Sequence, residues 1–150
     1  MILTNSATYD NLDSGYGVIS MLDKVEYWLE LCDDDLRAAK NLLASKDYLW
    51  MGFICHLIAE KSLKAVIASI TEEVPPKTHH LIKLANMANL TSDLSEAQLT
   101  LLSELMPLQI EARYPEHKAK IVATLTKDYC AKLLTETEEF LCWIKTRLGK

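Results

Sequence analysis

The sequence predicts an all-α protein, an up-and-down four-helix bundle with one additional short helix. The chain of 150 residues contains only 4 Gly and 4 Pro, which is too few of the turn-forming residues that a many-stranded sheet requires. Several long stretches place apolar residues at steps of three and four, the period of an amphipathic helix. The length and a hydrophobic content of 49% fit one domain with a substantial core.

The first segments are an arm and two long helices. Residues 1–20 mix Asn, Asp, Ser and Gly without a period and predict an N-terminal arm before a domain at 21–150. From Met21 to Ser45 one apolar stripe predicts the first helix, with Trp28, Cys32, Leu36, Ala39 and Leu43 on that stripe. The helix that starts near Tyr48 is apolar on nearly all sides, so we expect it to be central in the bundle.

The second half of the chain predicts three more helices. Thr78 is the expected N-cap of a short third helix. Ser95, with Gln98 three residues later, predicts a capping box that opens the fourth helix, and Pro107 is expected to kink or restart it. Past Pro115 we expect a long last helix, whose apolar stripe consists of Cys130, Leu133, Thr137, Leu141, Ile144 and Leu148.

The charge balance limits the partners of this chain. With 16 basic and 21 acidic side chains the formal net charge is -5, so the surface as a whole repels phosphate and bulk DNA binding is not expected. Any nucleic-acid site must then be a local patch of cations. The candidates for that patch are Lys61, Lys64, Lys77, Lys83, Lys118 and Lys120.

The cysteines and the apolar runs predict a cytoplasmic protein. The four cysteines are far apart within apolar helical stretches, which indicates reduced, buried thiols rather than disulfides or metal ligands. The first residues lack the pattern of a signal peptide. The longest apolar run, at 49–59, contains His56 and is too short to span a bilayer, so no membrane association is expected.

Three segments, in order, resemble the signature of the HEPN domain family: HLIAEKSLKA at 56–65, PKTHHL at 76–81 and ARYP at 112–115. The resemblance extends over about residues 24–145. It implies a compact helical bundle, often a homodimer, in a family associated with nucleotide or RNA binding. It also implies RNA cleavage in some branches and pairing with a small nucleotidyltransferase in toxin–antitoxin operons.

A binding site is the first functional hypothesis, with Arg113, Tyr114, Glu60, Lys61, Lys64 and His80 as its residues. The planar guanidinium of Arg113 can donate two parallel hydrogen bonds to a phosphate. Tyr114 offers a ring on which a base can stack. His80 lies in an expected first helical turn, where backbone N–H groups favour anions.

Two other functions remain open. The first is a metal-independent ribonuclease, in which His117 takes the 2′-hydroxyl proton and Arg113 stabilises the charge on the phosphate. Only three residues separate this pair, fewer than in the ribonuclease branches, so binding ranks before catalysis. The second is a protein-interaction bundle without a ligand.

Purely structural interpretations of the same residues, without a ligand, also remain open. An ion pair with Glu60 or Glu111 at a helix end explains Arg113 equally well. Glu60 and Lys64, four residues apart, fit a surface ion pair on a solvated helix face. Neither a metal nor another cofactor is expected, because the Glu-x-x-His pattern of di-metal bundles does not occur.

Overall fold

The computed structural model describes residues 21–110 and 114–150, apart from the side chains at 21, 110 and 115–117. The arm expected at 1–20 lies outside the described residues. Throughout the described part of the chain the regular structure is helical, which confirms the all-α prediction. The helices are α2 (Met21–Ala44), α3 (Tyr48–Ile70), α4 (Leu81–Met87), α5 (Glu96–Ile110), α6 (Pro115–Thr124) and α7 (Lys127–Arg147).

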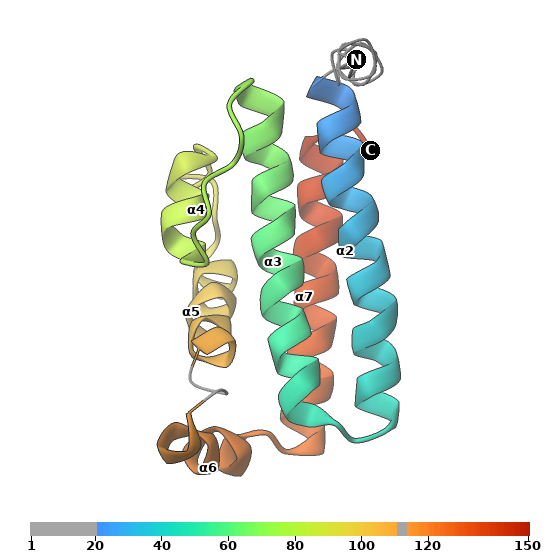
Figure 1. Ribbon diagram of the computed structural model, residues 1–150, viewed down its shortest axis with the longest axis vertical. Coiled ribbons are helices and arrows are strands. Elements are labelled where there is room, and N and C mark those ends of the chain that lie inside the picture. Colours follow the sequence, from blue (N-terminus) through green and yellow to red (C-terminus); the bar gives the residue numbers. More distant parts are fainter. Residues whose placement is uncertain (1–20, 111–113) are drawn as a thin grey trace, which may run out of the picture.

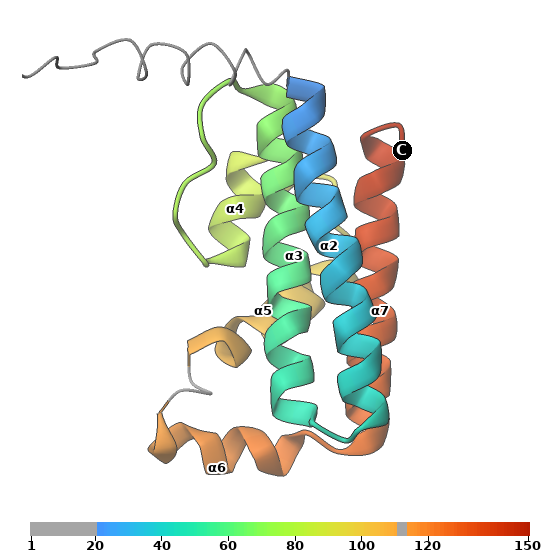
Figure 2. The ribbon, with the colours of Figure 1, turned by 45° about the vertical axis from the view of Figure 1, so that its right-hand side comes forward.

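The helix α3 is the centre of the bundle, as its apolar sequence predicts. The long helices α2 and α7 lie along one side of it, and α4 and α5 lie along the other (Figure 1). The shorter α6 runs across the end of the bundle, near the turn that joins α2 to α3 (Figure 2). Because α3 contacts every other described helix, a residue on α3 can take part in a site with any of them.

The helix starts confirm one predicted cap and correct another. At the start of α5, the Ser95 N–H donates to the Gln98 side chain at 2.9 Å, and the Gln98 N–H donates to the Ser95 hydroxyl at 3.1 Å. This is the predicted capping box. The prediction of Thr78 as an N-cap is wrong, because the N-cap of α4 is His80, two residues later, whose ring accepts the Lys83 N–H at 3.2 Å.

The chain past Pro115 forms two helices rather than one. Tyr114 has the extended backbone that a residue before proline prefers, and Pro115 then occupies the first turn of α6. This helix ends at Thr124, and the Thr126 side chain caps α7 by accepting the Tyr129 N–H at 3.2 Å. The N-cap at Thr126 starts a new helix, and it is the local cause of the break between α6 and α7. Pro107 lies inside α5, which continues to Ile110.

The cysteine prediction holds for three of four residues. Cys32, Cys55 and Cys130 are buried in the core, whereas Cys142 is exposed on the outer side of α7, and all four thiols are free. Burial raises the pKa of both Cys32 and Cys55 to about 12, so these two thiols are unreactive at neutral pH. Among the described helices, none has both the length and the apolar character needed to cross a membrane.

Candidate functional site

The clearest concentration of ionisable side chains surrounds the carboxylate of Glu60. His56, Glu60 and Lys64 lie four residues apart and therefore share one face of α3. His79, from the connector between α3 and α4, joins them at Glu60. Lys64 Nζ lies 2.8 Å from Glu60 Oε1, and His79 Nδ1 lies 3.1 and 3.0 Å from the two carboxylate oxygens. We call these four residues the Glu60 cluster.

The cluster is buried on its α3 side and open at His79. Glu60 is 5% exposed and Lys64 is 7% exposed, while the His79 side chain is 53% exposed. Trp28 of α2 lies over Lys64, with its ring centroid 5.7 Å from Nζ. The expectation of a solvated surface pair is therefore wrong, because a neighbouring helix and the connector cover these charges.

The hydrogen bonds define which ring nitrogens carry protons. The His79 carbonyl oxygen lies 3.1 Å from His56 Nε2 and can only accept, so this nitrogen donates. His56 Nδ1 is then unprotonated. It has no hydrogen-bond partner among the described residues and lies 3.6 Å from Glu60 Oε2. Burial lowers the pKa of His56 to about 4 despite the opposing attraction of Glu60, so the ring is neutral at pH 7.

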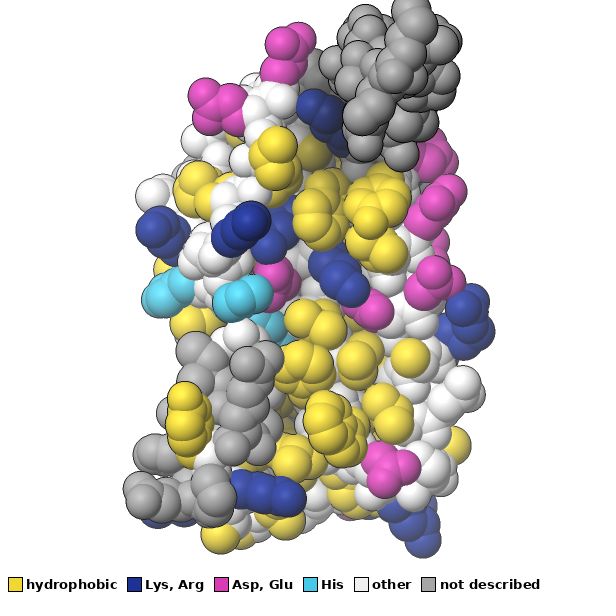
Figure 3. Space-filling view, viewed as in Figure 1, with side chains coloured by type: hydrophobic (Ala, Val, Ile, Leu, Met, Phe, Trp, Pro, Cys, Tyr) yellow, Lys and Arg dark blue, Asp and Glu magenta, His cyan; other side chains and the backbone are white. Residues whose placement is uncertain are grey.

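A cavity of about 260 Å³ lies beside the cluster, between the connector and the C-terminal part of α5. The residues that line it are Lys77, Thr78, His79, His80, Met106 and Gln109. Lys77 makes no ion pair with any described residue. Figure 3 shows histidine and lysine side chains gathered on this part of the surface, at the edge of a hydrophobic area. The cavity therefore has one lysine at its rim, on a protein whose net charge is -5.

A second hollow lies at the N-terminal end of α3. It has a volume of about 310 Å³, and Lys46, Trp50 and Lys118 are among the residues that line it, at the turn before α3 and on α6. The cavity beside His79 differs because His79 contacts the buried carboxylate of Glu60, so we place the candidate site there. The described residues hold no group of three or more His, Cys, Asp or Glu side chains arranged for a metal ion.

The structure brings together part of the site expected from the sequence. Glu60 and Lys64 lie in the Glu60 cluster, and His80 lines the adjacent cavity. Lys61 pairs instead with Asp35 of α2 at 2.6 Å. Tyr114 occupies the N-cap position of α6 without a side-chain capping hydrogen bond and is 58% exposed.

The two expected catalytic residues are not tested by these contacts. Arg113 lies outside the described residues, as does the side chain of His117, whose backbone belongs to α6. Sequence reasoning missed the contact between His79 and Glu60 and the lining residue Gln109. The spacing of residues along the sequence predicts neither the contact nor the lining residue. His79 lies next to α3 only because of the path that the connector takes.

Comparisons with known proteins agree with this architecture. A family model described as HEPN domain matches residues 25–147. The chain is similar to the crystal structure of the protein TT1696 from Thermus thermophilus, with a TM-score of 0.68 and 21% sequence identity. That match covers 82% of this chain and 97% of the other, and at this identity it shows the fold alone. No curated protein sequence matches the chain.

Proposed function

Because the chain belongs to the HEPN domain family, we propose that it is a helical module that binds the phosphate of a nucleotide or of RNA in the cavity beside His79. The observation that carries the proposal is Lys77, a cation without an ionic partner among the described residues, at the rim of that cavity. An unpaired ammonium group offers three hydrogen-bond donors to an anion. It also gives local attraction on a chain whose net charge is -5.

The other residues of the site have complementary roles in the proposal. The ring of His80 and the amide of Gln109 supply hydrogen-bonding groups around the phosphate. Lys64 contributes less, because Glu60 already balances its charge. We further propose Arg113, four residues after Gln109, as a second cation and Tyr114 as a stacking surface for a base.

Ligand binding is expected to raise the melting temperature in the presence of millimolar nucleotide or a short single-stranded RNA. A ligand that binds only the folded state stabilises it by about 2.7 kcal/mol at a hundred times its Kd. Lys77→Ala is expected to weaken binding about tenfold, because it removes a charge-assisted hydrogen bond of about 1.5 kcal/mol or more. Differential scanning fluorimetry and filter retention of labelled RNA measure both effects.

The matched control is Lys132→Ala, which removes an exposed lysine of α7, a helix that contributes no residue to the lining of the cavity. If both variants weaken RNA binding equally, the RNA is attracted nonspecifically by lysines and not bound at the cavity. If neither nucleotide nor RNA binds, the proposed function is wrong and the protein-interaction bundle is the better explanation.

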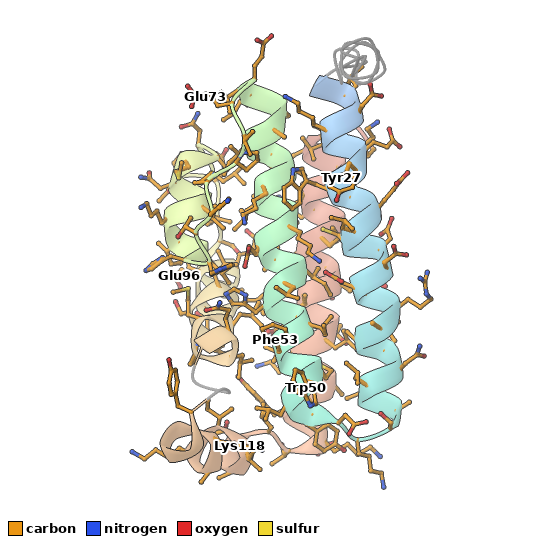
Figure 4. The ribbon with its side chains drawn as sticks, viewed as in Figure 1. Tyr27, Trp50, Phe53, Glu73, Glu96 and Lys118 are labelled. Carbon is orange, nitrogen blue, oxygen red and sulfur yellow. The ribbon has the colours of Figure 1, made fainter. Side chains whose placement is uncertain are left out.

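We also propose that the protein forms a homodimer through the exposed side of α3. Trp50 is 62% exposed on this side, and Phe53, Ile54 and Leu57 are only partly buried. Figure 4 shows Trp50 and Phe53 on the face of α3 turned toward the viewer, and Figure 3 shows hydrophobic side chains over the same face. A helix that is apolar on all sides is normally covered on all sides, and aromatic residues are enriched at interfaces. A second copy would cover this face, in keeping with the homodimers that the family resemblance implies.

Phe53→Glu is expected to convert the dimer into a monomer, because it places a charge in the centre of the apolar face. Light scattering should give twice the chain mass of 17.0 kDa for the unmodified protein and the single mass for the variant. Met87→Glu, on an exposed position of α4, is the control and should remain dimeric. A mass of one chain at every concentration of the unmodified protein would refute the dimer.

The partner and the compartment complete the proposal. We propose action with a protein partner such as a nucleotidyltransferase, in a toxin–antitoxin-like pair, as the resemblance of the sequence implies. The four free thiols suit the reducing cytoplasm, which we propose as the location.

A further inference from the structure

A groove of about 480 Å³ lies between the start of α5 and the C-terminal half of α7, and it is larger than both hollows described above. Among the residues that line it are Asp93, Leu101, Glu136, Glu139, Phe140 and Trp143. We call it the α5–α7 groove. It shares no lining residue with the cavity beside His79 or with the α3 face proposed for the dimer, so all three surfaces can act separately.

The α5–α7 groove combines aromatic rings with carboxylates. Glu136, Phe140 and Trp143 follow at steps of four and three, so they share one face of α7. Phe140 is buried, and its ring centroid lies 5.8 Å from that of Trp143. Glu139 is exposed and makes no ion pair with any described residue. Glu136 has Lys132 at 3.7 Å, which is beyond hydrogen-bond distance, so neither carboxylate has a close cation among the described residues.

A guanidinium of the chain itself is already held at the edge of this groove. Arg147, one turn after Trp143, has its Cζ 5.2 Å from the centroid of the Trp143 ring. Its Nη2 lies 2.7 Å from Asp93 Oδ2. A planar guanidinium can stack on a ring and pair with a carboxylate at the same time, which a lysine ammonium does less well. Trp143 and Asp93 therefore hold one arginine, while Glu136 and Glu139 are left for a second cation.

The start of α5 does not oppose a cation in the groove. A helix N-terminus normally carries a partial positive charge, because its first N–H groups are free. Here the N–H groups of Ser95 and Gln98 are both used in the capping box. Glu96 adds a carboxylate in the first turn. The groove therefore attracts cations and repels the phosphates of RNA.

We propose that the α5–α7 groove binds an arginine side chain in a basic segment of a partner protein. The guanidinium pairs with Glu136 and Glu139, and the apolar stem of the arginine lies against Leu101 and Phe140. The Trp143 ring favours a planar guanidinium over the ammonium groups of lysine or of a free polyamine. This inference goes beyond the proposed function and does not rest on it, because it uses none of the residues of the phosphate site.

The test measures the binding of a fluorescein-labelled peptide of alternating arginine and glycine to the full chain, by fluorescence anisotropy. Physiological ionic strength limits long-range attraction to about 8 Å. Glu136→Gln combined with Glu139→Gln should weaken binding about tenfold or more, the effect of losing one charge-assisted hydrogen bond. The control pair, Glu30→Gln with Glu73→Gln, removes two exposed carboxylates outside the groove and should bind normally.

A second comparison tests the choice of arginine. A peptide of alternating lysine and glycine should bind the unmodified protein more weakly than the arginine peptide, and Trp143→Leu should remove this preference. Circular dichroism checks that each variant is folded. If Trp143→Leu does not fold, the two carboxylate variants and the comparison of the two peptides on the unmodified protein decide the question.

Three results overturn the inference. The first is no binding of the arginine peptide, or equal weakening by the control pair, which traces the attraction to net charge alone. The second is equal binding of the arginine and lysine peptides, which leaves an acidic surface without a guanidinium site. The third is tighter binding of spermine than of the arginine peptide, measured by displacement, which assigns the groove to a free polyamine.

Discussion

Replacing Lys64 with methionine is expected to lower the free energy of unfolding by about 3 kcal/mol, the lower end of the range for a broken buried ion pair. Glu60 is 5% exposed and would lose the ammonium group that lies 2.8 Å from it. His79 still donates to the carboxylate, which is why we expect the lower end of the range. Guanidinium unfolding measures the effect, with a lower midpoint and an unchanged dependence on denaturant concentration.

The same substitution at Lys40 is the matched control. Lys40 pairs with Glu138 at 2.8 Å, but the two side chains are 52% and 39% exposed, so its loss should change stability by less than about 1 kcal/mol. Equal effects of the two substitutions would show that Glu60 is stabilised without Lys64. A double variant, Glu60→Leu with Lys64→Met, should recover much of the loss, because apolar residues of similar volume often replace a buried pair without penalty.

The helical framework could be predicted because local sequence determines it. The steps of three and four in α2, the apolar character of α3 and the pair Ser95 and Gln98 each act within one or two turns. The errors arise where two local signals compete. At the start of α4, Thr78 and His80 are both able to accept an N–H, and at Thr126 a cap interrupts what periodicity alone reads as one helix.

The candidate site was less predictable because it depends on packing between distant segments. The spacing of His56, Glu60 and Lys64 correctly places them on one face of α3. Spacing cannot show whether that face is covered, and the cover comes from Trp28 of α2 and from the connector that carries His79. Spacing also cannot show that two lysines of α3 have different partners. Lys64 is buried against Glu60, whereas Lys61 pairs with Asp35 of α2.

The burial of His56 is expected to make the folded protein less stable as the pH falls from about 6.5 to 4. Its pKa is lowered from 6.5 to about 4 in the folded chain, mainly by burial. Between these values the unfolded chain binds a proton at His56 and the folded chain does not, so unfolding is favoured as the pH falls. At about 1.4 kcal/mol for each pKa unit, the stability lost over the window is about 3 kcal/mol. Above pH 6.5 both states leave the ring neutral, and this residue adds no pH dependence.

His56→Gln isolates this effect, because glutamine keeps an N–H donor for the His79 carbonyl but does not titrate. Glu60, Lys64 and His79 remain in both proteins, so their own titration contributes to both curves. Denaturant unfolding at several values between pH 7 and 4.5 should show the unmodified protein losing about 2 to 3 kcal/mol more than the variant. Parallel curves would mean that His56 takes up a proton at the same pH in the folded and the unfolded chain, so that its pKa is not lowered by burial. A larger loss of stability in the variant than in the unmodified protein would mean that the 3.6 Å contact between Nδ1 and Oε2 is an ion pair of an imidazolium with Glu60.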